Sequence, residues 1–287
     1  MPLWQAIVLA VVQGITEFLP ISSTAHLVLF PWLFGWRDPG LAFDVALHVG
    51  TLVAVLLYFY KTWVDLLFLG LGREPIFLKS DSSLQNSSRM DLDRRRALFW
   101  FLVLATIPAA LAGWLFEKQV ETTLRNPVVV GCALIAVAIP MAWGEKVSRY
   151  RKDLHSVTLS DSLWVGVAQA FALIPGVSRS GITITAALFR DFRREAAARF
   201  SFLLSTPIIA GAALKALLDV KGQEIPPEMR LPVLAGVIVS GLVGYAAIAA
   251  FLRFLQFGTF KIFIYYRVIL GIIVLALAFF HHLGAAL

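Results

Sequence analysis

The stretch SLWVGVAQAFALIPGVSRSGITITAALF, residues 162–189, decides the fold of this chain. It is apolar except for a central break, PGVSRSG at residues 175–181, which contains its one charged residue, Arg179. A proline inside a helix removes a hydrogen bond and kinks or breaks the helix. Each half is too short to cross a bilayer, because a membrane helix needs about 20 apolar residues. The stretch therefore predicts a re-entrant helical hairpin that enters the membrane and returns.

A second apolar region, residues 1–36, has the same organisation. Its one charged residue is Glu17, and its break is PISST at residues 20–24. Backbone that leaves the helix at membrane depth is tolerated only where protein or a wet cavity surrounds it. We therefore expect the two breaks to face a common polar pocket.

The composition points to lipid as the main solvent of the chain. Of its 287 residues, 59% are hydrophobic and 15% are charged, and the mean hydropathy is +0.79. Soluble domains are about half apolar and about a quarter charged. These values exclude an ordinary cytosolic enzyme, a disordered chain and a nucleic-acid binder.

Six further segments are long and apolar enough, or nearly so, to span the membrane. They are Leu41–Tyr60, Ala97–Phe116, Pro127–Gly144, Phe200–Leu214, Leu231–Leu252 and Ile262–Phe280. The prediction is an all-α integral membrane protein with six transmembrane helices plus two re-entrant helical hairpins. Residues 1–287 would form a single polytopic membrane domain.

The basic residues set the orientation, because Lys and Arg concentrate in cytoplasmic loops. If both hairpins return to the side they enter, eighteen Lys and Arg residues fall on one side and six on the other. The eighteen lie in residues 61–96, 146–152, 190–199 and 253–267. The net charge of +7 is thus a topology signal and not a sign of nucleic-acid binding.

A shift of 156 residues aligns the two hairpins. It places Gln13 on Gln169 and Ser22 on Ser178, and each hairpin precedes three spans. By the charge count the hairpins enter from opposite sides, which predicts an inverted-topology repeat, roughly 1–145 and 160–287. Inverted repeats with broken helices place the functional site near the midplane, at the repeat interface.

Glu17 and Arg179 carry opposite charges, one in each hairpin. A charge in the bilayer core costs about 2.5–3.5 kcal/mol on insertion scales, so a shared pocket would reduce the cost of both. One interpretation is a structural pair that locks the hairpins together. The surrounding hydroxyl groups favour a functional site instead: Ser22, Ser23, Thr24, Ser178, Ser180 and Thr183.

The second break has the chemistry of an anion site. Arg179, nearby hydroxyls and the N-terminus of the following half-helix all suit a phosphate group. A carboxylate repels phosphate, so Glu17 either holds a divalent cation or acts as a general base. Gln13 lies four residues before Glu17 and so shares a helix face with it. His26 relays a proton or orients a hydroxyl nucleophile. His48 is expected in the core or the pocket wall.

Two motifs at the breaks resemble the undecaprenyl-diphosphate phosphatase family, also known as bacitracin-resistance proteins. They are QGITEFLPISSTAH at residues 13–26 and PGVSRSGIT at residues 175–183. The resemblance implies removal of the terminal phosphate from a C55 isoprenyl diphosphate in the bacterial inner membrane, with the active site facing the periplasm. That reaction recycles the carrier lipid for cell-wall synthesis. A divalent cation, Mg²⁺ or Ca²⁺, and a homodimer are also implied.

The same resemblance assigns roles by motif position. Glu17, His26 and Arg179 would be catalytic, and Ser23 would be the nucleophile or would position water. The diphosphate would be bound by Ser22, Thr24, Ser178, Arg179, Ser180 and Thr183. Metal would be held by Glu17 and Gln13; many family members have Glu at the latter position, where an amide supplies only one carbonyl oxygen.

Two other functions remain open from the residues alone. A secondary transporter or lipid flippase would also have an inverted repeat and an anion site at the midplane. An intramembrane serine protease could use Ser23 and His26, but it leaves the Arg179 motif unexplained.

Overall fold

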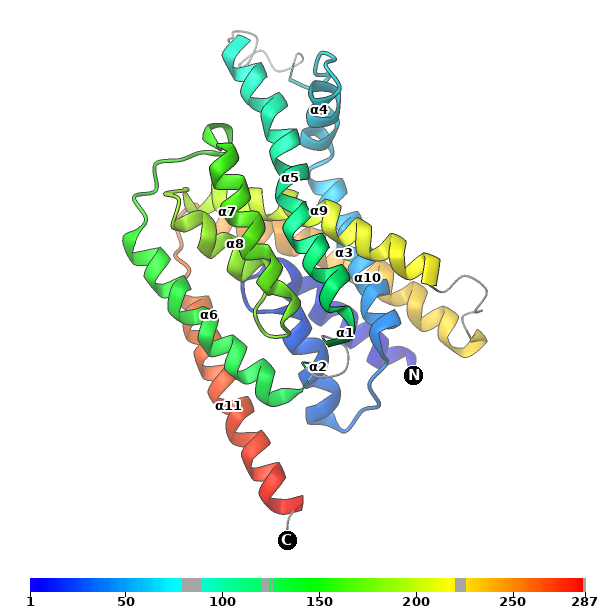
Figure 1. The fold of residues 1–287 in the computed structure, drawn as a ribbon. Helices are drawn as coiled ribbons and strands as arrows, with labels where there is room; N and C mark the ends of the chain where they lie inside the picture. The colour runs from blue at the N-terminus through cyan, green and yellow to red at the C-terminus, as the bar shows by residue number, and fades with distance from the viewer. Residues whose placement is uncertain (79–88, 120–123, 125, 220–225, 286–287) are drawn as a thin grey trace.

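The computed structural model describes residues 1–78, 89–119, 124, 126–219 and 226–285. These residues form helices and connecting loops, and no β-strand occurs among them (Figure 1). The α-helices are α1 (Leu3–Phe18), α2 (Ser23–Phe34), α3 (Leu41–Tyr58), α4 (Tyr60–Gly70), α5 (Arg89–Gln119), α6 (Pro127–Val147), α7 (Leu159–Ala170), α8 (Arg179–Leu188), α9 (Arg194–Asp219), α10 (Pro227–Phe254) and α11 (Lys261–Ala285).

Several helices are long and apolar enough to cross a membrane. In the described ranges there are five, within α5, α6, α9, α10 and α11, and a sixth if α3 and α4 count as one broken span. This confirms a multi-pass, all-α membrane protein. The segment Leu41–Tyr60, expected as one continuous helix, ends instead at Tyr58, and α4 leaves it at an angle of 77°.

Helix ends extend beyond the apolar segments. The basic segment 61–96, expected as a cytoplasmic loop, contains most of α4 and the start of α5 at residues 89–96, and its residues 79–88 lie outside the described residues. Likewise α9 begins at Arg194 and not at Phe200. Backbone hydrogen bonding continues along a helix after it leaves the apolar region, so hydropathy marks the buried part and not the helix end.

Both breaks occur where the sequence predicts them, and both restart a helix in the same way. Ser22 precedes α2 with φ 76°, and Ser178 precedes α8 with φ 71°. Each Ser Oγ accepts a hydrogen bond from the backbone N–H three residues on, at 3.3 Å from Ala25 and 3.1 Å from Gly181. This is N-capping. A positive φ at a residue other than glycine is strained and tends to persist at functional sites.

The short helices pack against long spans from the other half of the chain. α1 lies on α10, α7 lies on α5, and α6 and α11 run side by side (Figure 1). Glycine permits the first two contacts. A Cβ at Gly14 would come within 2.7 Å of Val243, and one at Gly166 within 2.4 Å of the Ala105 carbonyl oxygen. The backbones therefore approach too closely for a side chain.

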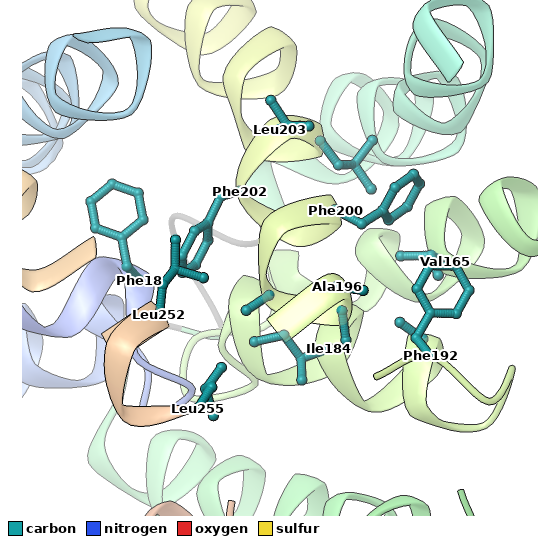
Figure 2. Close-up of a cluster of buried hydrophobic side chains, with 14 of the residues drawn as sticks. Phe18, Val165, Ile184, Phe192, Ala196, Phe200, Phe202, Leu203, Leu252 and Leu255 are labelled. Carbon is teal, nitrogen blue, oxygen red and sulfur yellow. The ribbon is translucent and has the colours of Figure 1, made fainter. Parts of the chain in front are cut away.

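The largest apolar cluster lies directly beside the residue pair predicted from the sequence. Figure 2 shows Phe18 of α1 beside Phe202 of α9 and Leu252 of α10. The Phe18 and Phe202 rings meet edge to face with centroids 5.2 Å apart. Ile184 of α8 belongs to the same cluster. Because this core joins the helix that carries Glu17 to the helix that begins at Arg179, it holds the two breaks near each other.

A polar cluster ties the start of α7 to the end of α8. The fully buried carboxylate of Asp161 accepts hydrogen bonds from Lys152 Nζ at 2.8 Å, Arg190 Nε at 2.6 Å and Thr158 Oγ1 at 2.8 Å. Burial raises the pKa of the Asp161 carboxyl, but the hydrogen bonds from Lys152, Arg190 and Thr158 outweigh burial and lower this pKa overall. The cluster thus joins the two ends of the segment that contains α7 and α8.

Candidate active site

Glu17 and Arg179 meet in the interior. Glu17 lies in the last turn of α1, and Arg179 is the first residue of α8. Arg179 Nη2 forms an ion pair with Glu17 Oε1, and its Nη1 donates to the Ser205 carbonyl at 3.1 Å. The side chain of Glu17 is only 4% exposed and that of Arg179 only 15% exposed. Two charges buried this far are stabilised mainly by each other.

The second carboxylate oxygen of Glu17 is also engaged. Its Oε2 accepts hydrogen bonds from Ser23 Oγ at 2.5 Å and from Gln13 Nε2 at 3.0 Å, and His48 Nε2 lies 3.4 Å away. The carboxylate therefore connects α1, α2, α3 and α8. The structure brings together four of the residues that the sequence placed at this site: Gln13, Glu17, Ser23 and Arg179.

The sequence did not place His48 at the carboxylate. His48 Nδ1 lies 2.7 Å from the Asp44 carbonyl oxygen, and a carbonyl only accepts, so Nδ1 carries a hydrogen. The contact between Nε2 and the carboxylate is attractive only if Nε2 carries a hydrogen as well. The geometry thus favours an imidazolium against Glu17. The available signal was a histidine within a span that is otherwise almost free of charge.

Most of the hydroxyl groups predicted at the site lie at the two breaks, but that of Thr183 contacts a neighbouring helix. Ser180 Oγ donates to the Leu19 carbonyl at 2.9 Å and so joins the second break to the first. The Ser22–Thr24 and Ser178–Ser180 hydroxyl pairs are 3.1 and 3.2 Å apart. Thr183, by contrast, is tied to α9, because its Oγ1 lies 2.7 Å from Ser201 Oγ.

Arg267 is a second residue whose place the sequence did not predict. It was counted among the basic residues of a cytoplasmic loop, but its side chain is completely buried. Its guanidinium donates to the carbonyls of Pro20 at 3.2 Å, Gly176 at 2.9 Å and Val177 at 3.0 Å, and further to two carbonyls of α6. One side chain thus holds the backbone of both breaks.

His26 lies beside the first break and points toward α11. Its Nδ1 is 2.7 Å from the Ser22 carbonyl oxygen, and its Nε2 is 2.7 Å from the hydroxyl of Tyr266. Both ring nitrogens are therefore engaged.

The residues present can contribute to a divalent-cation site. Gln13 Oε1 is buried and has no hydrogen-bond partner within the described residues, and it lies on the side chain that donates to Glu17. Mg²⁺ and Ca²⁺ take oxygen ligands, typically a carboxylate with carbonyl, water or phosphate oxygens. The described residues contain no group of three or more His, Cys, Asp or Glu side chains placed to hold a metal. Glu17 and Gln13 Oε1 would therefore supply two oxygen ligands of a divalent cation.

The fold and this arrangement define a polytopic membrane protein with a polar site built on two broken helices. Its donors, a guanidinium, hydroxyls and helix N-termini, suit an anionic group, and its carboxylate and imidazoles suit proton transfer.

The chain belongs to the family described as bacitracin resistance protein BacA, whose model matches residues 6–273. It is similar over its length to proteins named undecaprenyl-diphosphatase. It is 47% identical to that of Moorella thermoacetica, over 96% of this chain and 98% of the relative. It is 45% identical to that of Pelotomaculum thermopropionicum, over 97% of each chain.

Proposed function

We propose that the protein is a membrane phosphatase that hydrolyses undecaprenyl diphosphate to undecaprenyl phosphate and inorganic phosphate. It recycles the carrier lipid for cell-wall synthesis and so confers resistance to bacitracin. The family and its relatives support this activity. The observation that carries the assignment to this site is the buried Glu17–Arg179 pair with Ser23 on the same carboxylate.

The two breaks bind the diphosphate together. The guanidinium fork of Arg179 pairs with phosphate oxygens, and the N-termini of α2 and α8 supply free N–H groups. Ser22, Thr24, Ser178 and Ser180 add hydroxyl donors. These groups stabilise the negative charge that builds up as the phosphoryl group is transferred. Thr183 stabilises the first turn of α8 at Arg179, since its Oγ1 also donates to the Arg179 carbonyl at 2.7 Å.

Glu17 acts as the base toward the attacking hydroxyl. Ser23 Oγ already donates to its Oε2, so the carboxylate can take a proton either from Ser23 or from a water that Ser23 positions. While Arg179 pairs with Glu17, the carboxylate is a poor base. When Arg179 turns to the incoming phosphate, Glu17 becomes a stronger base. Substrate binding therefore activates the base.

A divalent cation, Mg²⁺ or Ca²⁺, would be held by Glu17 and by Gln13 Oε1, with phosphate oxygens of the substrate. When bound, it neutralises charge on the phosphoryl group that is transferred. The homodimer that the family resemblance implies stays a prediction.

The site belongs to two re-entrant hairpins of an inverted repeat, roughly 1–145 and 160–287. Three observations support this topology: the matching caps at Ser22 and Ser178, the lengths of α1, α2, α7 and α8, and the reciprocal packing of α1 on α10 and α7 on α5. The family resemblance implies a site that opens to the periplasmic face of the bacterial inner membrane, and the distribution of Lys and Arg sets which loops lie in the cytoplasm.

A transporter or flippase of the same lipid is the alternative, because an inverted repeat suits transport. The deciding experiment measures phosphate release from C55 and C15 prenyl diphosphates by the purified protein in detergent, with and without a chelator. Sustained release without any gradient is the expected result. Binding of both lipids without release would favour the transporter.

A further inference from the structure

The hydrogen bonds of His26 fix its protonation pattern. A carbonyl oxygen only accepts, so the nitrogen that contacts the Ser22 carbonyl, Nδ1, carries a hydrogen. In the neutral imidazole the other nitrogen, Nε2, is then an acceptor. The hydroxyl of Tyr266, 2.7 Å away, is the donor that fills it. The two rings are also stacked, with centroids 5.8 Å apart and planes 12° from parallel.

Tyr266 therefore covers the one nitrogen of His26 that can take a proton. His26 is only 5% exposed, whereas Tyr266 is 40% exposed. Tyr266 is thus the more accessible residue of the pair. A proton from the reaction that is to reach Nε2 meets the Tyr266 oxygen first.

We propose that Tyr266 of α11 is a positioning residue of the active site, which holds His26 as the Nδ1–H tautomer and passes protons to its Nε2. This inference rests on the phosphatase function proposed above. When a proton that the reaction has released to the site follows this route, it binds to the phenol oxygen as the phenol's own hydrogen moves to Nε2. The phenol is regenerated, the imidazole becomes an imidazolium, and no electron is gained or lost.

The neighbouring residues supply a matched control and the electrostatic setting. Tyr265 precedes Tyr266 on the same helix and is 65% exposed. Arg267 follows it, and its positive charge acts on the His26 ring. Because Arg267 stays in place in all the variants below, changes in their pH profiles report the Tyr266–His26 pair.

The test compares Tyr266→Phe, which keeps the stacked ring and removes the hydroxyl, with Tyr265→Phe. We expect Tyr266→Phe to lower kcat on the order of 10²-fold, the size of a lost acid–base step, with KM for the C15 diphosphate unchanged and the pH profile of kcat shifted. Tyr265→Phe should match the wild type. His26→Asn with Tyr266→Phe should be no slower than His26→Asn alone, because the two residues act as one unit.

Three results would overturn the proposal: a wild-type kcat and pH profile in Tyr266→Phe, an effect on KM alone, or rate losses that multiply in the double variant. ¹⁵N NMR of the His26 ring in the wild-type protein gives a readout independent of activity. A hydrogen on Nε2 with none on Nδ1 would also overturn it. If the wild-type protein releases no phosphate while His26 has the expected tautomer, the proposed function fails and the geometry stands.

Discussion

The carboxylate of Glu17 forms an ion pair with the guanidinium of Arg179, although 162 residues separate them in the chain. Each is the one charged residue of its apolar region, and in each region a new helix begins after a capping serine with a strained backbone. The pair therefore links the two halves of the chain at the point where the backbone leaves regular helix.

Replacing Arg179 with lysine should remove most of the activity. Lysine keeps the charge but cannot reproduce a planar, bidentate contact with phosphate. We expect a loss of kcat/KM on the order of 10²-fold in a phosphate-release assay. Arg193→Lys is a suitable control, because Arg193 forms an exposed ion pair with Asp153. Near-normal release by Arg179→Lys would remove this residue from the mechanism.

Glu17→Gln should be inactive at every Mg²⁺ concentration. The glutamine side chain has nearly the same shape as glutamate, but it cannot take the proton of Ser23 and it leaves the positive charge of Arg179 without a counter-charge. The measurement is phosphate release across a metal titration, with the exposed Glu228→Gln as control. Full rescue of Glu17→Gln by excess metal would mean that the carboxylate only tunes metal affinity.

Arg267→Leu should both unfold more easily and lose activity. The change leaves carbonyls of both breaks without their donor, and a buried polar group without a partner costs about 1–3 kcal/mol. We expect a clearly lower thermal midpoint in detergent, and partial recovery in Arg267→Lys, which has three donors in place of five. The exposed Arg253→Leu should change neither quantity. An unchanged midpoint in Arg267→Leu would contradict this account of the breaks.

Asp161→Asn should destabilise the protein by roughly 2 kcal/mol at neutral pH, since the amide cannot pair with Lys152 and Arg190. The pKa of Asp161 is lowered on folding, so its stabilising contribution is complete above the ordinary Asp value of about 3.9 and is lost as the pH falls through the lowered value. Thermal midpoints of both proteins across a pH series should therefore converge in acid. A constant difference down to the lowest pH would contradict this prediction.

The sequence predicts the breaks and the central pair for physical reasons that need no coordinates. A proline followed by small polar residues interrupts an apolar helix, as at residues 20–24 and 175–181. A lone charge in lipid requires a partner, so Glu17 and Arg179 could be matched by their opposite signs. The bend between Tyr58 and Tyr60 has no such signal, because no proline or glycine lies there.

The remaining site residues depend on contacts that leave no pattern in the chain. Arg267 bonds to backbone carbonyls, which every residue has, so no partner could be identified from residue types. His48 and Tyr266 reach the site only because α3 and α11 pack beside the first break. Thr183 matches a family motif, yet its hydroxyl faces Ser201 of α9. The helix breaks can thus be predicted from residue type and spacing, whereas the side chains that contact the breaks depend on how the helices pack.

Release of inorganic phosphate from C55 prenyl diphosphate is the most direct test of the central claim, measured side by side for the wild-type protein, Glu17→Gln and Arg179→Lys in detergent. The account predicts many turnovers by the wild type without any gradient and a near-complete loss in both variants. Turnover at the wild-type rate by either variant would contradict it.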